Sequence, residues 1–175
     1  NHYGVPQQRP RTILIALKQE YAQHFVWPIG AVAPPPTVGQ VLYNEMVRNG
    51  WKGAKEWADQ ADRIAPTIVG GSKKHGGADL GPTRSRLAWE KLGVDGRGIV
   101  DEAPEKDFVG MPRLTVKMAA MIQGFPPEWE FTGKKTPAYR QVGNAFPPPV
   151  AKAMGGAIKR ALMVAQEDRL EEVAL

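Results

Sequence analysis

Apolar residues along this chain follow two different spacings. Thr12 to Leu17 forms a short, almost continuous apolar run, which is typical of a strand buried on both faces inside a parallel sheet. Residues 38–49 and 54–64 instead repeat apolar positions at helical intervals, after the proline-rich residues 28–36. Thr37 is a favourable N-cap for the first of these helices. The pattern predicts one central strand followed by two amphipathic helices.

The second half of the chain predicts three more helices. The first covers residues 83–92, the second follows an N-cap at Thr115 and continues through Ile122, and the third, at 150–170, is long and begins after three prolines. Residues 65–82 are rich in glycine and have too little apolar content for a core element, and residues 94–112 are expected to form a loop. No other run resembles residues 12–17, so the sheet partners of that strand are expected outside this chain.

A polar stretch precedes the final helix. Residues 139–145 predict a turn whose last residues are Gly143, Asn144 and Ala145. Unpaired N–H groups and the positive dipole end collect at a helix N-terminus. The turn is therefore a candidate for approaching a polar ligand, and a plain loop with a helix cap is the alternative interpretation.

The composition limits the kinds of site and partner that this chain can have. The 175 residues suffice for one domain with a small appendage. The chain has no cysteine, which excludes a disulfide framework, a thiolate zinc site and a thiol nucleophile within it, and its three histidines are isolated, so no metal site is predicted. A formal charge of +5 allows a polyanionic partner. No membrane span or secretory signal is expected, and the start at Asn1 indicates a piece of a longer polypeptide.

Three ordered blocks carry a family resemblance. They are Gln7-x-Arg9-x-Arg11, then Arg113-Leu-Thr with Gln123-Gly-Phe-Pro, then Tyr139 to Pro148. Together they resemble the eighth, ninth and tenth blocks of the DNA (cytosine-5) methyltransferases, whose variable target-recognition region would correspond to about residues 20–110. The resemblance implies an α/β fold: the C-terminal part of a Rossmann-like catalytic domain plus a small, loop-rich target-recognition domain.

The same resemblance implies a division of the chain. Residues 1–27 would end the catalytic domain, 28–112 would form the target-recognition domain, and 113–149 would hold the hinge and the cofactor-side blocks. Residues 150–175 would be a helix that packs back on the catalytic domain. Within the ninth block, Met118 and Met121 stand where an acidic residue and an arginine are usual, so we expect an apolar contact in place of an ion pair.

Roles for individual residues follow from the resemblance. Gln7, Arg9 and Arg11 would face the flipped cytosine and nearby phosphates as catalytic residues, and a guanidinium suits both ligands because it offers paired donors and a permanent charge. From the sequence alone, two surface arginines beside a strand remain the alternative. Residues beside the S-adenosylmethionine cofactor would be Phe125, Asn144, Ala145 and Phe146.

The glycine-rich middle supplies candidate DNA contacts. Thr67 and Ile68 resemble the Thr-aliphatic pair that precedes a base-reading loop in the family. Lysines can neutralise phosphates and arginines can donate to guanine, although solvated surface charges are the alternative. The expected DNA-binding residues are Thr67, Ile68, Ser72, Lys73, Lys74, Arg84 and Arg86.

The family reaction needs a cysteine thiolate that attacks a base flipped out of the DNA stack. This chain has no cysteine, so we expect it to be inactive alone. It would be a fragment of a one-chain enzyme or the small subunit of a split enzyme. A non-catalytic DNA-binding module is the third alternative, disfavoured by the cofactor-side turn. The implied partners are double-stranded DNA and an N-terminal catalytic part, in the cytoplasm of a bacterium, near the nucleoid, in a restriction–modification setting.

Overall fold

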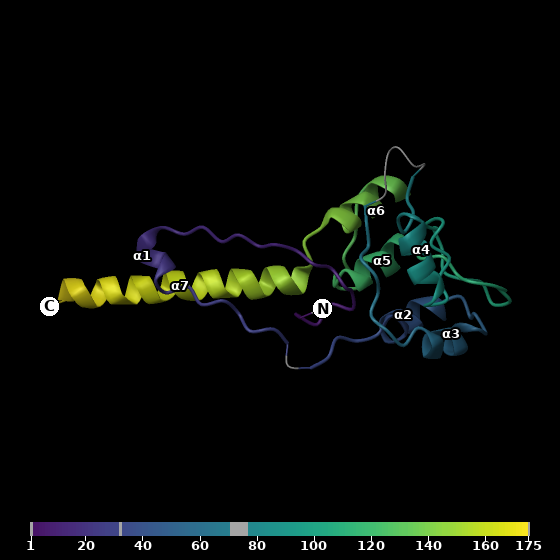
Figure 1. Ribbon diagram of the computed structural model, residues 1–175, viewed down its shortest axis with the longest axis horizontal. Coiled ribbons are helices and arrows are strands. Elements are labelled where there is room, and N and C mark those ends of the chain that lie inside the picture. The colour runs from purple at the N-terminus through teal and green to yellow at the C-terminus, as the bar shows by residue number, and fades with distance from the viewer. Residues whose placement is uncertain (1, 32, 71–76, 175) are drawn as a thin grey trace.

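The computed structural model describes residues 2–31, 33–70 and 77–174, and within them the regular structure is helical. Helices α2 to α6 gather into one body, while α7 extends from it as a long arm with α1 beside its far half (Figure 1). An ion pair between Glu20 and Arg169, at 3.0 Å, joins α1 to α7. The helices are α1 (Gln19–Ala22), α2 (Val38–Met46), α3 (Ala54–Gln60), α4 (Thr83–Glu90), α5 (Val116–Ile122), α6 (Lys135–Asn144) and α7 (Pro148–Ala174).

The strand predicted over residues 12–17 is not formed. This segment is neither strand nor bridge, and the side chain of Leu14 is exposed, with 89% of its surface accessible. A central strand depends on neighbours for its backbone hydrogen bonds and for covering both of its faces. The described part of the chain supplies only isolated bridges, such as that between Gln7 and Ala65, so the sheet of the expected α/β fold is not present in it.

The first predicted helix is confirmed together with its cap. Thr37 Oγ1 accepts a hydrogen bond from the Gln40 N–H at 3.2 Å, and Gln40 Oε1 accepts one from the Thr37 N–H at 2.9 Å. This reciprocal capping box satisfies two N–H groups that the helix leaves unpaired. The predicted helix 38–49 is therefore correct in position and ends three residues early, at Met46.

The second predicted helix is shorter than expected and ends at Gln60. Beyond it the carbonyls of Ala61 and Arg63 accept hydrogen bonds from the Gly39 and Val38 N–H groups, at 2.8 and 2.9 Å. These bonds draw the chain across the first turn of α2, so the helix cannot continue. The two helices approach closely, since a Cβ on Gly39 would lie 2.0 Å from the Ala58 carbonyl oxygen.

The turn predicted over residues 139–145 is wrong for most of its length. Helix α6 continues to Asn144, and Ala145 is its extended C-cap. Ala138, Tyr139 and Val142 share one face of this helix and are buried, so packing overrides the turn tendency of the Gly-Asn pair. Only the short connection before Pro148, where α7 begins, is left as a turn.

The core fills the space between α2, α3, α4, α5 and α6. Residues 65–82, expected to lack core elements, contribute to it, because Ile68 and Leu80 are fully buried. Burial of such apolar surface is the main stabilising contribution to the body. Other large side chains of this core are Leu42, Met46, Trp57, Trp89, Met118, Ile122 and Tyr139.

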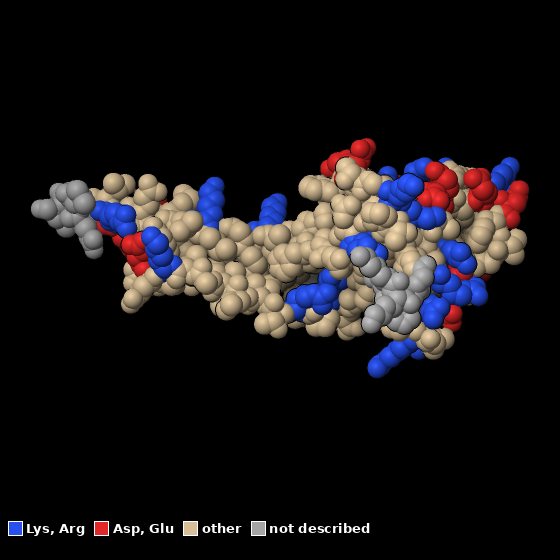
Figure 2. All heavy atoms as spheres, turned by 90° about the horizontal axis from the view of Figure 1, so that it is seen from above, with Lys and Arg blue, Asp and Glu red and all other residues tan. Residues whose placement is uncertain are grey.

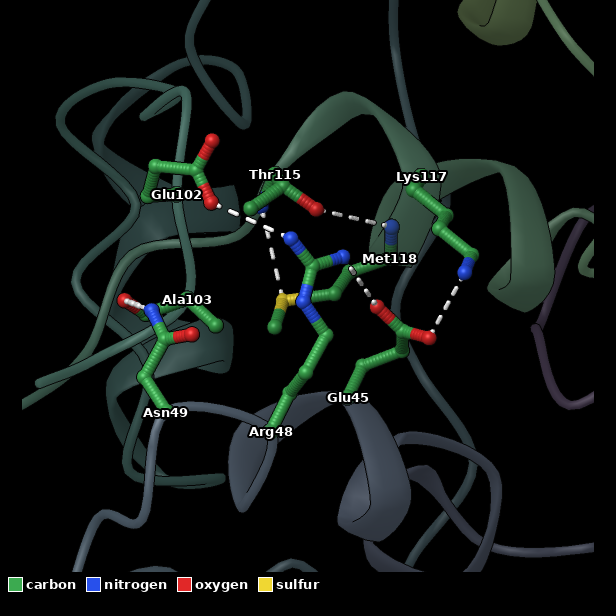
Figure 3. Close-up of polar contacts among 8 residues, drawn as sticks. All are labelled: Glu45, Arg48, Asn49, Glu102, Ala103, Thr115, Lys117 and Met118. Carbon is green, nitrogen blue, oxygen red and sulfur yellow. Dashed lines mark hydrogen bonds and ion pairs between the residues drawn. The ribbon is translucent and has the colours of Figure 1, made fainter.

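Polar contacts join α2 to α5, and the residues just after α2 to the segment around residues 100–103 (Figure 3). Glu45 pairs with Lys117 at 2.7 Å, while Arg48 pairs with Glu102 at 3.2 Å. The Arg48–Glu102 pair is solvent-exposed, so it stabilises the fold by about 1 kcal/mol at most. The Glu45 side chain is only 14% exposed. Beneath these pairs Met118 is buried, and its sulfur lies 3.5 Å from the Thr115 N–H in the capping box of α5.

Candidate functional site

A pair of buried amides joins four distant segments. Gln7 is fully buried; its Nε2 donates to Gln123 Oε1, and its Oε1 accepts from the Ile68 N–H at 2.7 Å. Gln123 Nε2 in turn donates to the carbonyls of Val142 and Ala145, at 3.2 and 2.8 Å. Buried amides are stable only when their polar atoms are paired. The amide pair therefore fixes the first block, the Thr67-Ile68 segment, the end of α5 and the end of α6 against one another.

Arg9 connects two of the same segments through hydrogen bonds, beside this amide pair. Its Nη1 donates to the Ile68 carbonyl at 2.6 Å and its Nη2 to the Gly143 carbonyl at 2.7 Å. Burial, with a smaller contribution from the charge of Arg11, lowers the pKa of Arg9 from its ordinary value. The Arg9 guanidinium is thus directed toward protein carbonyls. One belongs to residues 67–70, here called the recognition segment after its predicted role, and the other to α6.

Arg11 is placed differently from Arg9. Its side chain is exposed, and within the described residues its guanidinium bonds only the neighbouring Pro10 carbonyl, at 2.8 Å. Arg11 lines a groove of about 610 Å³ together with Arg9, Thr67 and Phe146. Residues predicted to be catalytic, DNA-binding and cofactor-binding therefore meet in one groove, although 135 positions separate Arg11 from Phe146.

Two glycines allow α6 to lie directly on the recognition segment. A Cβ on Gly143 would lie 2.3 Å from the Gly70 Cα and 2.7 Å from the Val69 carbonyl carbon. Asn144 Oδ1 lies only 3.0 Å from the Cβ position of Gly70. The contact is therefore between backbones, and any side chain at Gly143 would force the two segments apart.

The expected cofactor-side residues separate into two groups. Asn144 is exposed at the end of α6, with Ala145 half-buried after it and Phe146 43% exposed in the groove. Phe125 is half-buried in an aromatic cluster, with its ring centroid 5.0 Å from that of Phe131. Phe125 is not among the residues that line the groove of Arg11.

The expected DNA-binding residues also lie in several different parts of the structure. Thr67 Oγ1 donates to the Gln8 carbonyl at 2.5 Å, while the side chain of Ile68 belongs to the core. Arg84 and Arg86 lie on the first turn of α4, where Arg86 Nη2 is 3.4 Å from Thr83 Oγ1. Ser72, Lys73 and Lys74 lie outside the described residues. Figure 2 shows Lys and Arg side chains, interspersed with Asp and Glu, over the broad end of the molecule that carries α4 and α6.

Two features of this region were not predicted. The first is the role of Gln123. It is part of the Gln-Gly-Phe-Pro block, but the sequence does not indicate that it is buried and hydrogen-bonded to Gln7. The second is Asp95, which accepts hydrogen bonds from both Arg97 and Arg113, with an Nε–Oδ distance of 2.9 Å for each. These bonds hold the pKa of Asp95 well below its usual range, with the Arg97 hydrogen bond as the largest cause, although burial opposes the shift. The sequence signal was an Asp-Gly-Arg-Gly tetrapeptide within an expected loop.

Comparison with known proteins tests the family resemblance. The model of the C-5 cytosine-specific DNA methylase family matches residues 1–160. The chain is 56% identical over 171 residues to the Type II methyltransferase M.NaeI of Lentzea aerocolonigenes, covering 95% of this chain and 41% of that protein. It is 50% identical over 163 residues to M.NgoMIV of Neisseria gonorrhoeae, covering 91% and 51%. A match of 59 residues, 46% identical, reaches DNA (cytosine-5)-methyltransferase 2 of Arabidopsis thaliana, over 34% of this chain and 4% of that protein.

The chain belongs to the C-5 cytosine-specific DNA methylase family. The family resemblance inferred from the blocks is thereby confirmed. The chain spans about half the length, or less, of the two bacterial relatives.

Within the described ranges no cluster of histidine and acidic side chains is placed to hold a metal ion. None of the helices described there is both long and apolar enough to cross a membrane.

Proposed function

We propose that this chain is the C-terminal, target-recognition part of a DNA (cytosine-5) methyltransferase, which transfers a methyl group from S-adenosylmethionine to carbon 5 of a flipped cytosine. The observation that carries the proposal is the contact between Gln7 and Gln123. It joins the first and second motif blocks, and Gln123 extends the contact to the third block through Val142 and Ala145. Such an arrangement supports a composite site built from all three blocks.

Within this site the two arginines have different tasks. Arg9 is a positioning residue, because its donors hold the recognition segment against α6. Arg11 is exposed in the groove, and its guanidinium can donate to the O2 of the flipped cytosine or to an adjacent phosphate. Gln7 supports both arginines by fixing the backbone of their segment through its bond to Ile68.

S-Adenosylmethionine fits the residues at the end of α6. The exposed ring of Phe146 offers a stacking surface for an adenine, and the exposed amide of Asn144 offers both a donor and an acceptor. Ala145 contributes backbone, while Phe125 would approach the cofactor from its own aromatic cluster. The cofactor supplies the methyl group; the residues of this chain bind and orient it.

The cysteine nucleophile must come from an N-terminal catalytic part, on the same polypeptide or on a separate subunit, because this chain contains no cysteine. Exposed apolar side chains support such a contact, since a large exposed apolar surface marks an interaction site. On residues 12–29 they are Leu14, Val26, Trp27 and Ile29, and on α7 they are Leu162, Met163, Val164 and Leu170. We propose that residues 1–27 and 150–175 complete the catalytic domain and the Rossmann-like sheet.

DNA recognition would use residues 28–112, with 113–149 as the hinge and the cofactor side. Arg84 and Arg86, on the first turn of α4, and Thr67, beside the groove, are the described candidates for contact. Ser72, Lys73 and Lys74 are added from the sequence alone. The two Type II bacterial relatives favour a bacterial restriction–modification setting, and hence action on DNA in the cytoplasm.

Reconstitution tests this proposal. The chain is mixed with the separately produced catalytic part, double-stranded DNA and S-adenosylmethionine carrying a tritiated methyl group. We expect label to enter cytosine carbon 5 only when both parts are present, and not when the catalytic cysteine is replaced by serine. Calorimetry should detect only weak cofactor binding by the chain alone. Equal methylation in the absence of this chain, or micromolar cofactor binding by it alone, would contradict the assignment.

A further inference from the structure

Asp95 holds the exposed Arg97 side chain in one orientation. The Asp95 side chain is only 10% exposed, whereas that of Arg97 is 67% exposed. Arg97 Nε donates to Oδ1 at 2.9 Å and Nη2 donates to Oδ2 at 3.2 Å. The Arg97 backbone N–H also donates to Oδ1, at 3.0 Å. The guanidinium plane is therefore fixed by a paired contact and by the local backbone.

Asp95 is itself anchored from the opposite side. Arg113 Nε donates to Asp95 Oδ2 at 2.9 Å, and the Asp95 N–H donates to the Pro112 carbonyl at 3.0 Å. The support for Arg97 thus reaches the first residues of the ninth block. An arginine that is oriented before it meets its ligand loses less side-chain entropy on binding.

The contact with Asp95 uses the side edge of the guanidinium, which consists of Nε and one hydrogen of Nη2. The outer edge, consisting of Nη1 and the second Nη2 hydrogen, makes no hydrogen bond to the residues that the structure describes. This outer edge carries two parallel donors in a rigid plane, which is the geometry that matches the O6 and N7 acceptors of guanine.

Arg97 lies beside the residues already proposed to contact DNA. The Gly96 carbonyl accepts a hydrogen bond from the Leu80 N–H at 3.0 Å, and the Cβ position of Gly96 lies 3.1 Å from Arg86 Cγ. The Arg97 turn therefore packs on the first turn of α4 and on the end of the glycine-rich segment. Basic and acidic side chains are interspersed over this end of the molecule (Figure 2).

We infer that Arg97 is a specificity-determining residue, which reads one guanine of the target site in the major groove by donating from Nη1 and Nη2 to O6 and N7. Asp95 is its positioning residue. This inference rests on the proposed function, since it requires a sequence-specific DNA methyltransferase. A phosphate contact would use the same charge, but it would not need a guanidinium plane fixed by a buried carboxylate.

The experiment uses the methyltransferase assembled from this chain and its catalytic part. A randomised duplex library is methylated by the wild type, and bisulfite sequencing gives the target sequence. Each guanine of that target is then replaced singly by 7-deazaguanine, which lacks the N7 acceptor, or by hypoxanthine, which keeps N7 and O6 and loses only the minor-groove amino group. The values of kcat/KM are compared for the wild type, Arg97→Gln and Arg48→Gln. Arg48 is the control, an arginine just after α2 that pairs with Glu102.

We expect Arg97→Gln to lower kcat/KM on the target by about 5- to 150-fold. At one guanine, 7-deazaguanine should slow the wild type and leave the variant unchanged, while penalties at the other guanines persist in both. Hypoxanthine at that guanine should have no effect, and Arg48→Gln should behave as the wild type.

Equal sensitivity of the wild type and Arg97→Gln at every guanine would overturn the inference. So would a uniform loss on all duplexes, because that indicates a phosphate contact. If Arg97→Gln does not fold, Arg97→Lys replaces it; it retains the charge but lacks the fork and should show the same selective loss. A wild-type assembly that methylates no duplex would instead refute the proposed function.

Discussion

Gln7 and Gln123 share a hydrogen bond between fully buried side-chain amides, although 116 positions separate them in the chain. The first amide also receives the Ile68 N–H, and the second also donates to Val142 and Ala145. The pair therefore couples the stability of the body to the position of the recognition segment. Substitution of either glutamine should therefore lower the free energy of unfolding, rather than remove one particular ligand contact.

The first prediction concerns Gln123→Leu. Leucine nearly preserves the volume but leaves the Gln7 Nε2 group and the Ala145 carbonyl without their partner, whereas the Val142 carbonyl keeps its bond from the Ala145 N–H. Each unpaired buried group costs about 1–3 kcal/mol, so we expect the free energy of unfolding to fall by about 2–5 kcal/mol. Urea denaturation of the chain measures this, and Gln8→Leu, at an exposed side chain, is the matched control.

The double variant Gln7→Leu with Gln123→Leu sharpens this test. Removing both amides removes both halves of the contact, so the combined loss should be smaller than the sum of the single losses by about 1 kcal/mol or more. Strict additivity of the two substitutions would show that the amides do not interact in solution.

The second prediction compares two glycine-to-alanine changes in helices. A Cβ on Gly143 would meet the backbone of Gly70 at 2.3 Å, whereas Gly155, in α7, has nothing within 4 Å of its Cβ position. We expect Gly143→Ala to destabilise the chain by about 2 kcal/mol or more and to lower methylation by the assembled enzyme. Gly155→Ala should be neutral or stabilising by about 0.5–1 kcal/mol, because alanine favours helix. Thermal unfolding of both variants decides the matter, and a Gly143→Ala protein as stable as the wild type would refute the backbone contact.

Local signals determine how much of this architecture can be predicted from the sequence. The helix after Thr37 was placed correctly because its N-cap residue and the spacing of its apolar positions are local features of the sequence. The strand at residues 12–17 failed because a strand requires neighbours, which the described chain lacks. Helix α6 was missed because its Gly-Asn pair favours a turn, while the burial of Tyr139 is decided by packing.

The candidate site likewise combines features that the order of residues indicates with features that depend on packing. The three blocks could be found by their residue order. The first and third meet in one groove, and the second is joined to both through Gln123. The buried partner of Gln7 and the orientation of Arg97 by Asp95 depend on contacts made in three dimensions. No spacing in the sequence distinguishes Arg9, which is bound by carbonyls, from Arg11, which is exposed.

The third prediction concerns acid stability. The hydrogen bonds from Arg97 and Arg113 lower the pKa of Asp95 in the folded state below its unfolded value of about 3.9. The unfolded state therefore binds the proton more readily, so the stabilisation by Asp95 is present above about pH 4 and is lost as the pH falls further. Asp95→Asn should reduce stability at pH 7 and flatten its decline between about pH 4 and pH 2. Urea unfolding across this range measures both effects, and parallel curves for the variant and the wild type would exclude the linkage.

The fourth prediction separates the two arginines of the first block. Arg11 makes one exposed bond to its neighbour's carbonyl, so Arg11→Ala should leave thermal unfolding unchanged. If Arg11 donates to the flipped cytosine or a phosphate, kcat/KM of the assembled methyltransferase should fall by about 10- to 150-fold, the loss of a charged hydrogen bond. Arg9→Ala should lower stability as well as activity, because it leaves the carbonyls of Ile68 and Gly143 without their donor. Wild-type turnover by Arg11→Ala would remove it from the site, and an Arg9→Ala protein of unchanged stability would contradict its positioning role.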